Sequence, residues 1–152
     1  PHRSADLNAH GEIINPRLDP ESVYRGTVPM FHGNGWCTPW AVTGIGGTHV
    51  CLRAVRADVI WRLIDGEGVT HLDGAPTVLT MIAEAPEAHR LDRELVATVA
   101  GAAPSPTVTA RMRELGARIV HAYGMTEPYG PYTINEWQPG WAALPPADQA
   151  RR

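Results

Sequence analysis

The chain has 152 residues, of which 43% are hydrophobic and 19% are charged, and its formal net charge is -3. A slightly acidic chain carries no broad basic field, which argues against nucleic acid and against an anionic membrane surface as partners. No apolar run approaches the roughly 20 residues of a membrane-spanning helix, and residues 1–10 lack the apolar core of a signal peptide. We therefore expect one domain in the cytoplasm.

Two cysteines, seven histidines and the lack of lysine limit the chemistry of the chain. Cys37 and Cys51 are too few for a disulfide scaffold and lack CxxC spacing, so we expect two buried thiols. The histidines are scattered, and none falls in a tight metal-ligand spacing such as HExxH. All thirteen basic residues are arginine. A Schiff-base lysine, or the lysine of a phosphate-binding loop, therefore cannot come from this chain.

The expected elements begin with a weak helix at residues 4–15, where small and apolar residues recur at helical spacing. Residues 28–40 are expected to end a strand near Phe31 and to begin a helix near Gly35. Residues 44–47 (GIGG) precede the next expected strand, whereas a dinucleotide-binding loop would follow a strand. We therefore interpret this glycine-rich stretch as a turn.

Strand-like and helix-like stretches then alternate as far as residue 124. Short runs rich in Val, Ile and Leu, each followed by a turn signal, predict buried strands at 48–53, 69–75, 95–103 and 118–124. Amphipathic stretches predict helices at 57–68, 76–86 and 105–116. Pro76 and Pro106 suit the first turn of their helices, and Ser105 is a candidate N-cap.

This alternation predicts an α/β fold, namely a parallel sheet with helices on both faces, as in flavodoxin-like domains. In such a sheet the carboxyl ends of the strands share one edge, so residues 73–76, 101–105 and 123–127 should converge there. The N-termini of the covering helices offer free N–H groups to anions. The pattern therefore predicts a binding site at this edge, for a flat and phosphorylated ligand.

Three segments, in this order, carry a resemblance to a known family: PMFHGNGW at 29–36, GAAPSP at 101–106 and YGMTEPYGP at 123–131. Together they resemble the acyl-adenylate-forming enzymes, specifically the acyl-CoA synthetases, and among these the branch that handles medium-chain carboxylic acids. The resemblance covers essentially the whole chain. It implies an ATP-dependent ligase that activates a carboxylic, typically fatty, acid as acyl-adenylate and transfers it to CoA. The implied cofactors are ATP/AMP, Mg²⁺ and CoA.

The resemblance also implies roles for residues on the nucleotide side. Tyr123 would stack on adenine, with Gly124 and Met125 beside it. Thr126 would donate to the α-phosphate, and Glu127 would hold Mg²⁺. Such a cation offsets the repulsion between two anionic reactants, and a neutral hydroxyl can follow the charge that develops. The adenine-side loop, which makes contact through its backbone, would be Ala102, Ala103 and Pro104.

On the acid side, His32 resembles a histidine near the acyl carboxylate, at the gate between the acyl and CoA channels. Together with Thr126 and Glu127, it completes the implied catalytic set. The residues that resemble the wall of the acyl pocket are His32, Asn34, Gly35, Trp36, Pro76 and Thr77.

Taken singly, these residues also have purely structural interpretations. Tyr123 could be a half-buried core ring, and Thr126 with Glu127 could cap a helix. His32 could be a hydrogen-bonded structural histidine. The tryptophans Trp36, Trp40 and Trp61 are expected to serve packing. The shared strand edge favours function for the first three assignments.

Other parts of the family pattern have no counterpart in this chain: the phosphate loop, the aspartate that holds ribose, and the C-terminal domain with its lysine. We therefore predict that residues 1–132 form a partial α/β adenylate-binding subdomain, and that residues 133–152 lead into the rest of the enzyme. Alone, the chain should be inactive, and its exposed apolar seams should favour self-association. The alternative is a non-catalytic, flavodoxin-like module that binds a ligand or partner.

Overall fold

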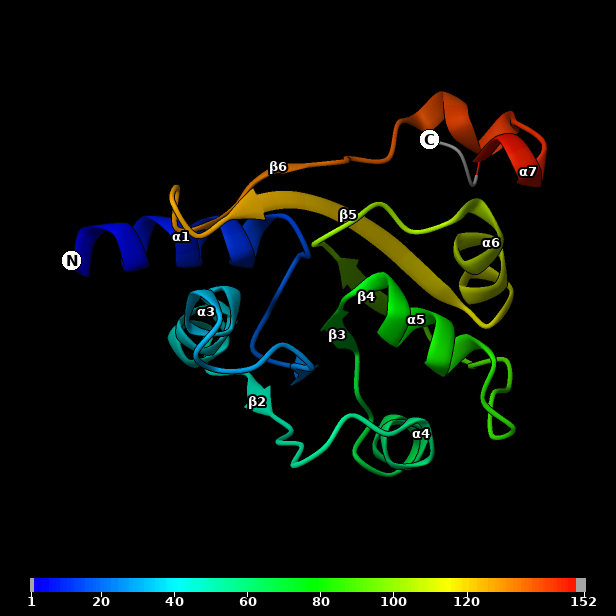
Figure 1. Ribbon diagram of the computed structural model, residues 1–152, viewed down its shortest axis with the longest axis horizontal. Coiled ribbons are helices and arrows are strands. Elements are labelled where there is room, and N and C mark those ends of the chain that lie inside the picture. The colour runs from blue at the N-terminus through cyan, green and yellow to red at the C-terminus, as the bar shows by residue number, and fades with distance from the viewer. Residues whose placement is uncertain (1, 150–152) are drawn as a thin grey trace.

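The computed structural model describes residues 2–149 and contains a six-stranded sheet of order β2-β1-β3-β4-β5-β6 (Figure 1). Strands β1 to β5 pair in parallel, and β6 runs antiparallel to β5. The strand order of β1 to β5 is that of a flavodoxin-like doubly wound sheet. The strands are Val23–Arg25 (β1), Thr48–His49 (β2), His71–Gly74 (β3), Leu95–Val99 (β4), Ala117–Met125 (β5) and Gly130–Ile134 (β6).

Helices connect the parallel strands, and a short helical segment follows β6 (Figure 1). The α-helices are His2–Ile14 (α1), Gly33–Trp36 (α2), Thr38–Ile45 (α3), Ala57–Gly66 (α4), Pro76–Ala83 (α5), Pro106–Glu114 (α6) and Pro146–Gln149 (α7), with a 3₁₀ turn at Pro139–Ala143. Pro76 and Pro106 lie in the first turn of their helices, and the Ser105 hydroxyl accepts a hydrogen bond from the Val108 amide (3.2 Å). These local predictions are therefore confirmed.

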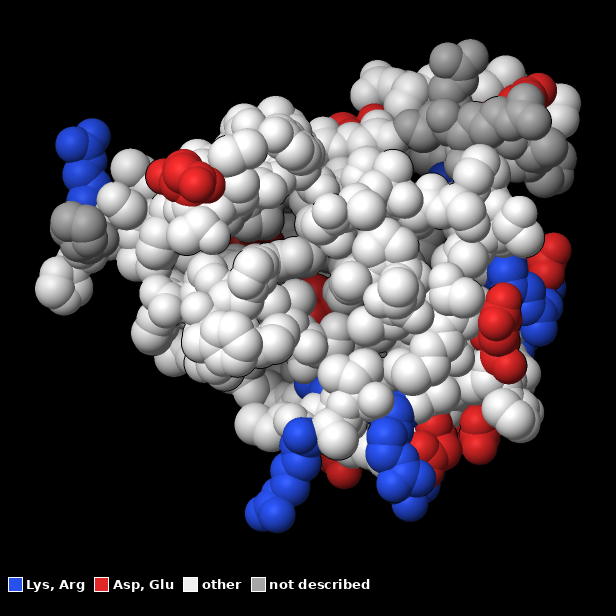
Figure 2. All heavy atoms as spheres, viewed as in Figure 1, with Lys and Arg blue, Asp and Glu red and all other residues white. Residues whose placement is uncertain are grey.

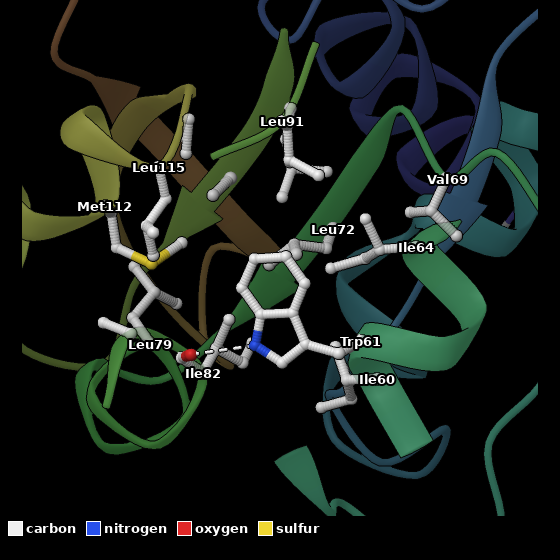
Figure 3. Packing of buried hydrophobic residues seen from close by; sticks show 14 of the residues in the cluster. Ile60, Trp61, Ile64, Val69, Leu72, Leu79, Ile82, Leu91, Met112 and Leu115 are labelled. Atoms are coloured by element: carbon white, nitrogen blue, oxygen red, sulfur yellow. Dashed lines mark hydrogen bonds between the residues drawn. The ribbon is translucent and has the colours of Figure 1, made fainter. Parts of the chain in front are cut away.

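Hydrophobic cores lie on both faces of the sheet, as predicted. On one face α4, α5 and α6 cover a cluster that includes Trp61 and Leu72 (Figure 3). The indole nitrogen of Trp61 donates to the carbonyl of Ile82 (3.0 Å), which satisfies its one polar atom. Because side chains alternate along a strand, the neighbour of Leu72, His71, points to the other face, where it stacks on Tyr24 beneath α1 and α3.

Two expected strands differ from the structure. The strand expected at 48–53 is limited to β2, because this stretch lies at the edge of the sheet with β1 as its one partner strand and both residues of β2 are exposed. The strand expected to end at Phe31 is absent, and β1 lies earlier. Pro29 has no N–H for a strand ladder, and its carbonyl accepts from His32 in a turn (2.9 Å) that leaves Phe31 86% exposed.

Strand β6 and the exposure of some side chains also differ from what the sequence predicts. Strand β6 follows a reversal at Gly130, whose φ of 100° is in the left-handed region, and it makes the sheet mixed instead of wholly parallel. Cys37 and Trp61 are buried as expected, whereas Cys51 and Trp40 are exposed. Within residues 2–149, none of the helices has both the length and the apolar character that a membrane crossing needs.

Candidate functional site

Three loops meet in a cleft at the carboxyl edge of the sheet. The cleft has a volume of about 60 Å³, and its walls come from the segments that follow β1 and β4 and from the β5–β6 turn. From the predicted site it brings together His32, Trp36, Gly124, Met125 and Thr126. The other lining residues are Gly33, Ala100, Gly101, Gly130 and Pro131. The parallel strands therefore deliver part of the acid-side set and part of the nucleotide-side set to one place.

The close approach of β5 and β6 shapes one wall of this cleft. A Cβ atom added at Gly124 would lie 2.2 Å from the carbonyl oxygen of Gly130, so no larger residue fits here without a backbone shift. The ladder is irregular between Tyr123 and Gly124. The Tyr123 ring is 53% exposed and lies edge-on to the ring of Tyr132, with ring centroids 5.3 Å apart. Tyr123 is thus an accessible aromatic surface and not a core ring.

Thr126 and Glu127 face two different hollows. They belong to a turn in which the Thr126 carbonyl accepts from the Tyr129 amide (3.0 Å). Thr126 lines the cleft, whereas Glu127 lines an open groove of about 580 Å³ between this turn and α1, together with Asn8 and Tyr132. The predicted hydroxyl donor and the predicted metal ligand are thus consecutive residues of one turn that line different hollows.

The carboxylate of Glu127 is exposed and takes part in none of the ion pairs found among residues 2–149. Within the same residues, no group of three His, Cys, Asp or Glu side chains could hold a metal ion. A single accessible carboxylate nevertheless fits Mg²⁺, which commonly takes one or two protein carboxylates and completes its shell with phosphate oxygens and water.

The segment that follows His32 has an unusual backbone. Residues 33–37 all have positive φ, between 50° and 64°, so they form a left-handed turn. For residues other than glycine this conformation costs about 1–2 kcal/mol each, less for asparagine. Asn34 is exposed and donates to the Tyr129 hydroxyl (3.0 Å), while Gly35 is buried against Met30 and Pro39. Neither residue lines the cleft, so their predicted place in the wall of an acyl pocket stays a prediction.

The remaining predicted residues lie outside the cleft. Pro76 and Thr77 begin α5 at the end of β3 and do not line it. Ala103 and Pro104 line a separate cavity of about 750 Å³ between α6, β5 and the segment after β6, and Ala102 lines neither hollow. On the wall of this cavity, the Arg113 guanidinium lies 4.5 Å from the centre of the Trp137 ring. Burial lowers the pKa of Arg113.

A buried acidic cluster, not predicted from the sequence, lies behind the cleft. Asp73, 1% exposed at the end of β3, accepts hydrogen bonds from the Thr27 amide, the Val28 amide (3.2 Å) and the Tyr24 hydroxyl (3.3 Å). These bonds tie the start of the loop that leads to His32 onto the sheet. The signal was available, because Asp73 is an acid inside the apolar run at 69–75.

Burial changes the protonation of this cluster. Desolvation raises the pKa of Asp73 to about 6, although the three hydrogen bonds and nearby Arg25 act in the opposite direction. Glu12 of α1 is 4% exposed, and burial, followed by the charge of Asp73, raises its pKa to about 8. Glu12 is therefore mostly a neutral acid at pH 7, which lets two carboxyl groups share one buried region.

The fold and the cleft define the chain as an α/β domain of the adenylate-forming type. It superposes on the N-terminal domain of FACL13 from Mycobacterium tuberculosis with a TM-score of 0.82 and 22% identity, over 99% of this chain and 36% of that one. It also matches ATP-bound MatB from Rhodopseudomonas palustris with a TM-score of 0.77 and 20% identity, over 88% of this chain and 27% of that one. At these identities the comparison establishes the fold.

Sequence similarity establishes the family. Residues 2–150 match the AMP-binding enzyme family, and the chain belongs to it. Over 152 residues it is 42% identical to 4-hydroxybutyrate–CoA ligase 2 of Metallosphaera sedula, and over 153 residues it is 40% identical to acetate/butyrate–CoA ligase AAE7 of Arabidopsis thaliana. These alignments cover 99% of this chain but only 28% and 27% of the two relatives. The family predicted from three motifs is therefore confirmed.

Proposed function

We propose that this chain is part of an ATP-dependent carboxylate–CoA ligase, which activates a carboxylic acid as acyl-adenylate and transfers the acyl group to CoA. The observation that carries the proposal is the cleft in which His32 and Trp36 meet Thr126, in a member of the AMP-binding family. The ligases to which the chain is similar are named for acetate, butyrate and 4-hydroxybutyrate. Their names support a small carboxylic acid in place of the fatty acid that the motifs suggested.

On the nucleotide side, we propose that the Thr126 hydroxyl donates a hydrogen bond to the phosphate oxygen that gains charge during adenylate formation. A well-placed donor of this kind contributes about 3 kcal/mol in other enzymes. Exposed Tyr123 provides a ring for adenine, and Gly124, Met125 and the backbone of Ala102, Ala103 and Pro104 line the nucleotide. Glu127 would hold Mg²⁺, which when bound offsets the repulsion between carboxylate and phosphate.

On the acid side, we propose that His32 and Trp36 contact the acyl carboxylate. The cleft is much smaller than the roughly 300 Å³ of a typical ligand pocket, so we propose that it holds only the carboxylate end of the acid. We assign Asn34 and Gly35 to holding the turn. Pro76 and Thr77 are proposed as the wall of a larger pocket, completed by parts of the enzyme outside this chain.

The metal role has a direct test in the full-length ligase that contains this chain. Glu127→Gln keeps the shape of the side chain but removes its charge, so carboxylate-dependent ATP–pyrophosphate exchange should fall by about 10²-fold or more. Glu114→Gln, on the exposed surface of α6, is the matched control and should leave exchange unchanged. Unchanged exchange in Glu127→Gln at saturating Mg²⁺ would remove Glu127 from the metal site.

For the isolated chain we propose no turnover, because it has no lysine and spans just over a quarter of the length of its relatives. The competing function is a non-catalytic module that binds a ligand or partner. Calorimetry with ATP, AMP and an acyl-adenylate mimic separates the two, because a mimic that fails to bind leaves only the module.

Two further expectations concern the protein in the cell. Met30, Phe31 and Met125 are exposed at the carboxyl edge, which supports self-association that light scattering would detect. The cytoplasm remains the predicted location, although the similar Arabidopsis ligase is described as peroxisomal. Fractionation of cells that express the full-length protein decides this point.

A further inference from the structure

The left-handed turn at residues 33–37 is explained only in part by its own sequence. Gly33, Asn34 and Gly35 adopt positive φ readily, but Trp36 and Cys37 carry side chains that disfavour it and still adopt it in succession. Inside the turn, the amides of Gly35 and Trp36 both donate to the His32 carbonyl (3.0 and 3.4 Å). A strained segment of this kind persists only where surrounding groups hold it. Its partners therefore show what determines the position of His32 and Trp36.

Tyr129 is the partner that reaches this turn from the far side of the cleft. Its hydroxyl accepts from the Asn34 side-chain amide (3.0 Å) and lies near the buried thiol of Cys37, whose pKa it lowers against the larger effect of burial. One side chain therefore contacts the turn at its second and its last residue.

The backbone of Tyr129 is itself fixed by two other elements. Its amide donates to the Thr126 carbonyl (3.0 Å), and its carbonyl accepts from the side-chain amide of Asn8 in α1. Tyr129 and Gly130 also have positive φ, of 70° and 100°, so the chain reverses immediately after the tyrosine. Hydrogen bonds thus hold Tyr129 in the β5–β6 turn, which also contains Thr126 and Glu127.

We propose that Tyr129 is a positioning residue, which holds the strained 33–37 turn and thereby sets the distance between the acid-side residues His32 and Trp36 and the nucleotide-side residue Thr126. What each side of the cleft binds rests on the proposed function. The coupling of the 33–37 turn to the β5–β6 turn through Tyr129 does not rest on it. Asn34 and Tyr129 are 95 residues apart in the sequence, so this single hydroxyl is a long-range link between two walls of one cleft.

Amide hydrogen exchange on the 152-residue chain tests the coupling directly. In Tyr129→Phe the aromatic ring remains, but both contacts of the hydroxyl are lost. The amides of Gly35 and Trp36 should then exchange at least about tenfold faster, through local opening of the turn. The amide of Val96, which donates to the Thr70 carbonyl in the centre of the sheet, should keep its wild-type rate. Unchanged rates at Gly35 and Trp36, or an equal acceleration at Val96, would overturn the proposal.

Two further variants keep the test specific. Tyr132→Phe removes a tyrosine hydroxyl from β6 that lies against Tyr123 and not against the turn, so the rates at Gly35 and Trp36 should not change. Asn34→Gly accepts positive φ without strain but lacks the amide donor. In that background, Tyr129→Phe should have a smaller effect than in the wild type, because the two variants remove the same hydrogen bond. If the effects of Asn34→Gly and Tyr129→Phe on the exchange rates are fully additive, the proposal is contradicted.

In the full-length ligase, Tyr129→Phe should affect the kinetic constants of the two substrates differently. Tyr129→Phe should lower kcat/KM for the carboxylic acid about tenfold and leave KM for ATP within about twofold, because only the acid-side loop is released. If KM for ATP changes by as large a factor as kcat/KM for the carboxylic acid, the positioning role is overturned. If even the wild-type enzyme shows no carboxylate-dependent exchange, the proposed function fails, while the hydrogen-exchange result still decides the coupling.

Discussion

The sheet face beneath α4, α5 and α6 and the carboxyl edge of the same sheet are stabilised in different ways. Beneath the helices, Trp61, Leu72 and Leu79 are fully enclosed, and burial of apolar surface supplies the stability. At the edge, Phe31 and Tyr123 remain exposed, and individual hydrogen bonds hold a strained backbone. The charged side chains visible in Figure 2 lie mostly around the rim of the face shown, and few lie at its centre.

This difference affects how the two regions respond to substitution. A core that depends on many small contacts tolerates thermal motion and keeps its average shape. An edge held by a few directional bonds can be changed locally by removing one of them. Substitutions in the two regions should therefore differ in kind as well as in size.

The largest loss of stability is expected in the core. Trp61→Ala removes a buried indole and leaves the Ile82 carbonyl without its donor, so the free energy of unfolding should fall by about 4 kcal/mol in urea titrations. Trp40→Ala is the control, because Trp40 is 48% exposed, and it should cost less than about 1 kcal/mol. Similar losses for the two tryptophans would contradict the assignment of the core to the α4–α6 face.

A somewhat smaller effect is expected where the edge approaches the core. Gly124→Ala forces a Cβ into the Gly130 carbonyl, and the backbone must shift, so we expect a loss of about 3 kcal/mol together with a distorted cleft. Gly66→Ala at the end of α4 meets no atom within 4 Å and should change stability by less than about 1 kcal/mol, in the stabilising direction. Equal melting temperatures for the two variants would show that β5 and β6 are not in close contact.

The core region was largely predictable from the sequence, because its signals are local. The spacing of Ile60 and Ile64, the prolines at helix starts and the Ser105 cap each act within one turn of a helix, and the structure contains all of them. The parallel sheet then follows from the alternation of strands and helices. The three motifs supplied the family, and the shared strand edge supplied the location of the cleft.

The edge was predictable only in part, because its conformation depends on distant partners. The left-handed turn requires Tyr129, which lies 95 residues beyond Asn34. No periodicity marks β6, which pairs with β5 only after the reversal at Gly130. That Thr126 and Glu127 line different hollows likewise depends on how this turn packs against α1, which sequence spacing does not encode.

The buried acids behind the cleft give an effect that is confined to high pH, and it is the most specific of the three. The pKa of Glu12 is raised from 4.5 in an unconstrained chain to about 8, so its neutral form favours the folded state. This contribution is fully present below pH 4.5 and is lost as the pH rises through 8. Asp73, with a pKa of about 6, acts in the same direction over a lower range, while the lowered pKa of His71 acts in the opposite direction.

Glu12→Gln isolates the contribution of Glu12, because glutamine keeps the shape of the neutral acid and cannot ionise. Relative to the wild type, the variant should gain several kcal/mol of unfolding free energy at pH 8.5, up to about 5 kcal/mol at about 1.4 kcal/mol per pKa unit, and almost nothing at pH 4. The difference between the two proteins cancels the effect of His71. Urea titrations at pH 4, 6 and 8.5 measure it, with Glu114→Gln as the exposed control. If the two stability curves run parallel across this range, Glu12 ionises freely in the folded protein, and the region behind the cleft is open to water instead of sealed by α1.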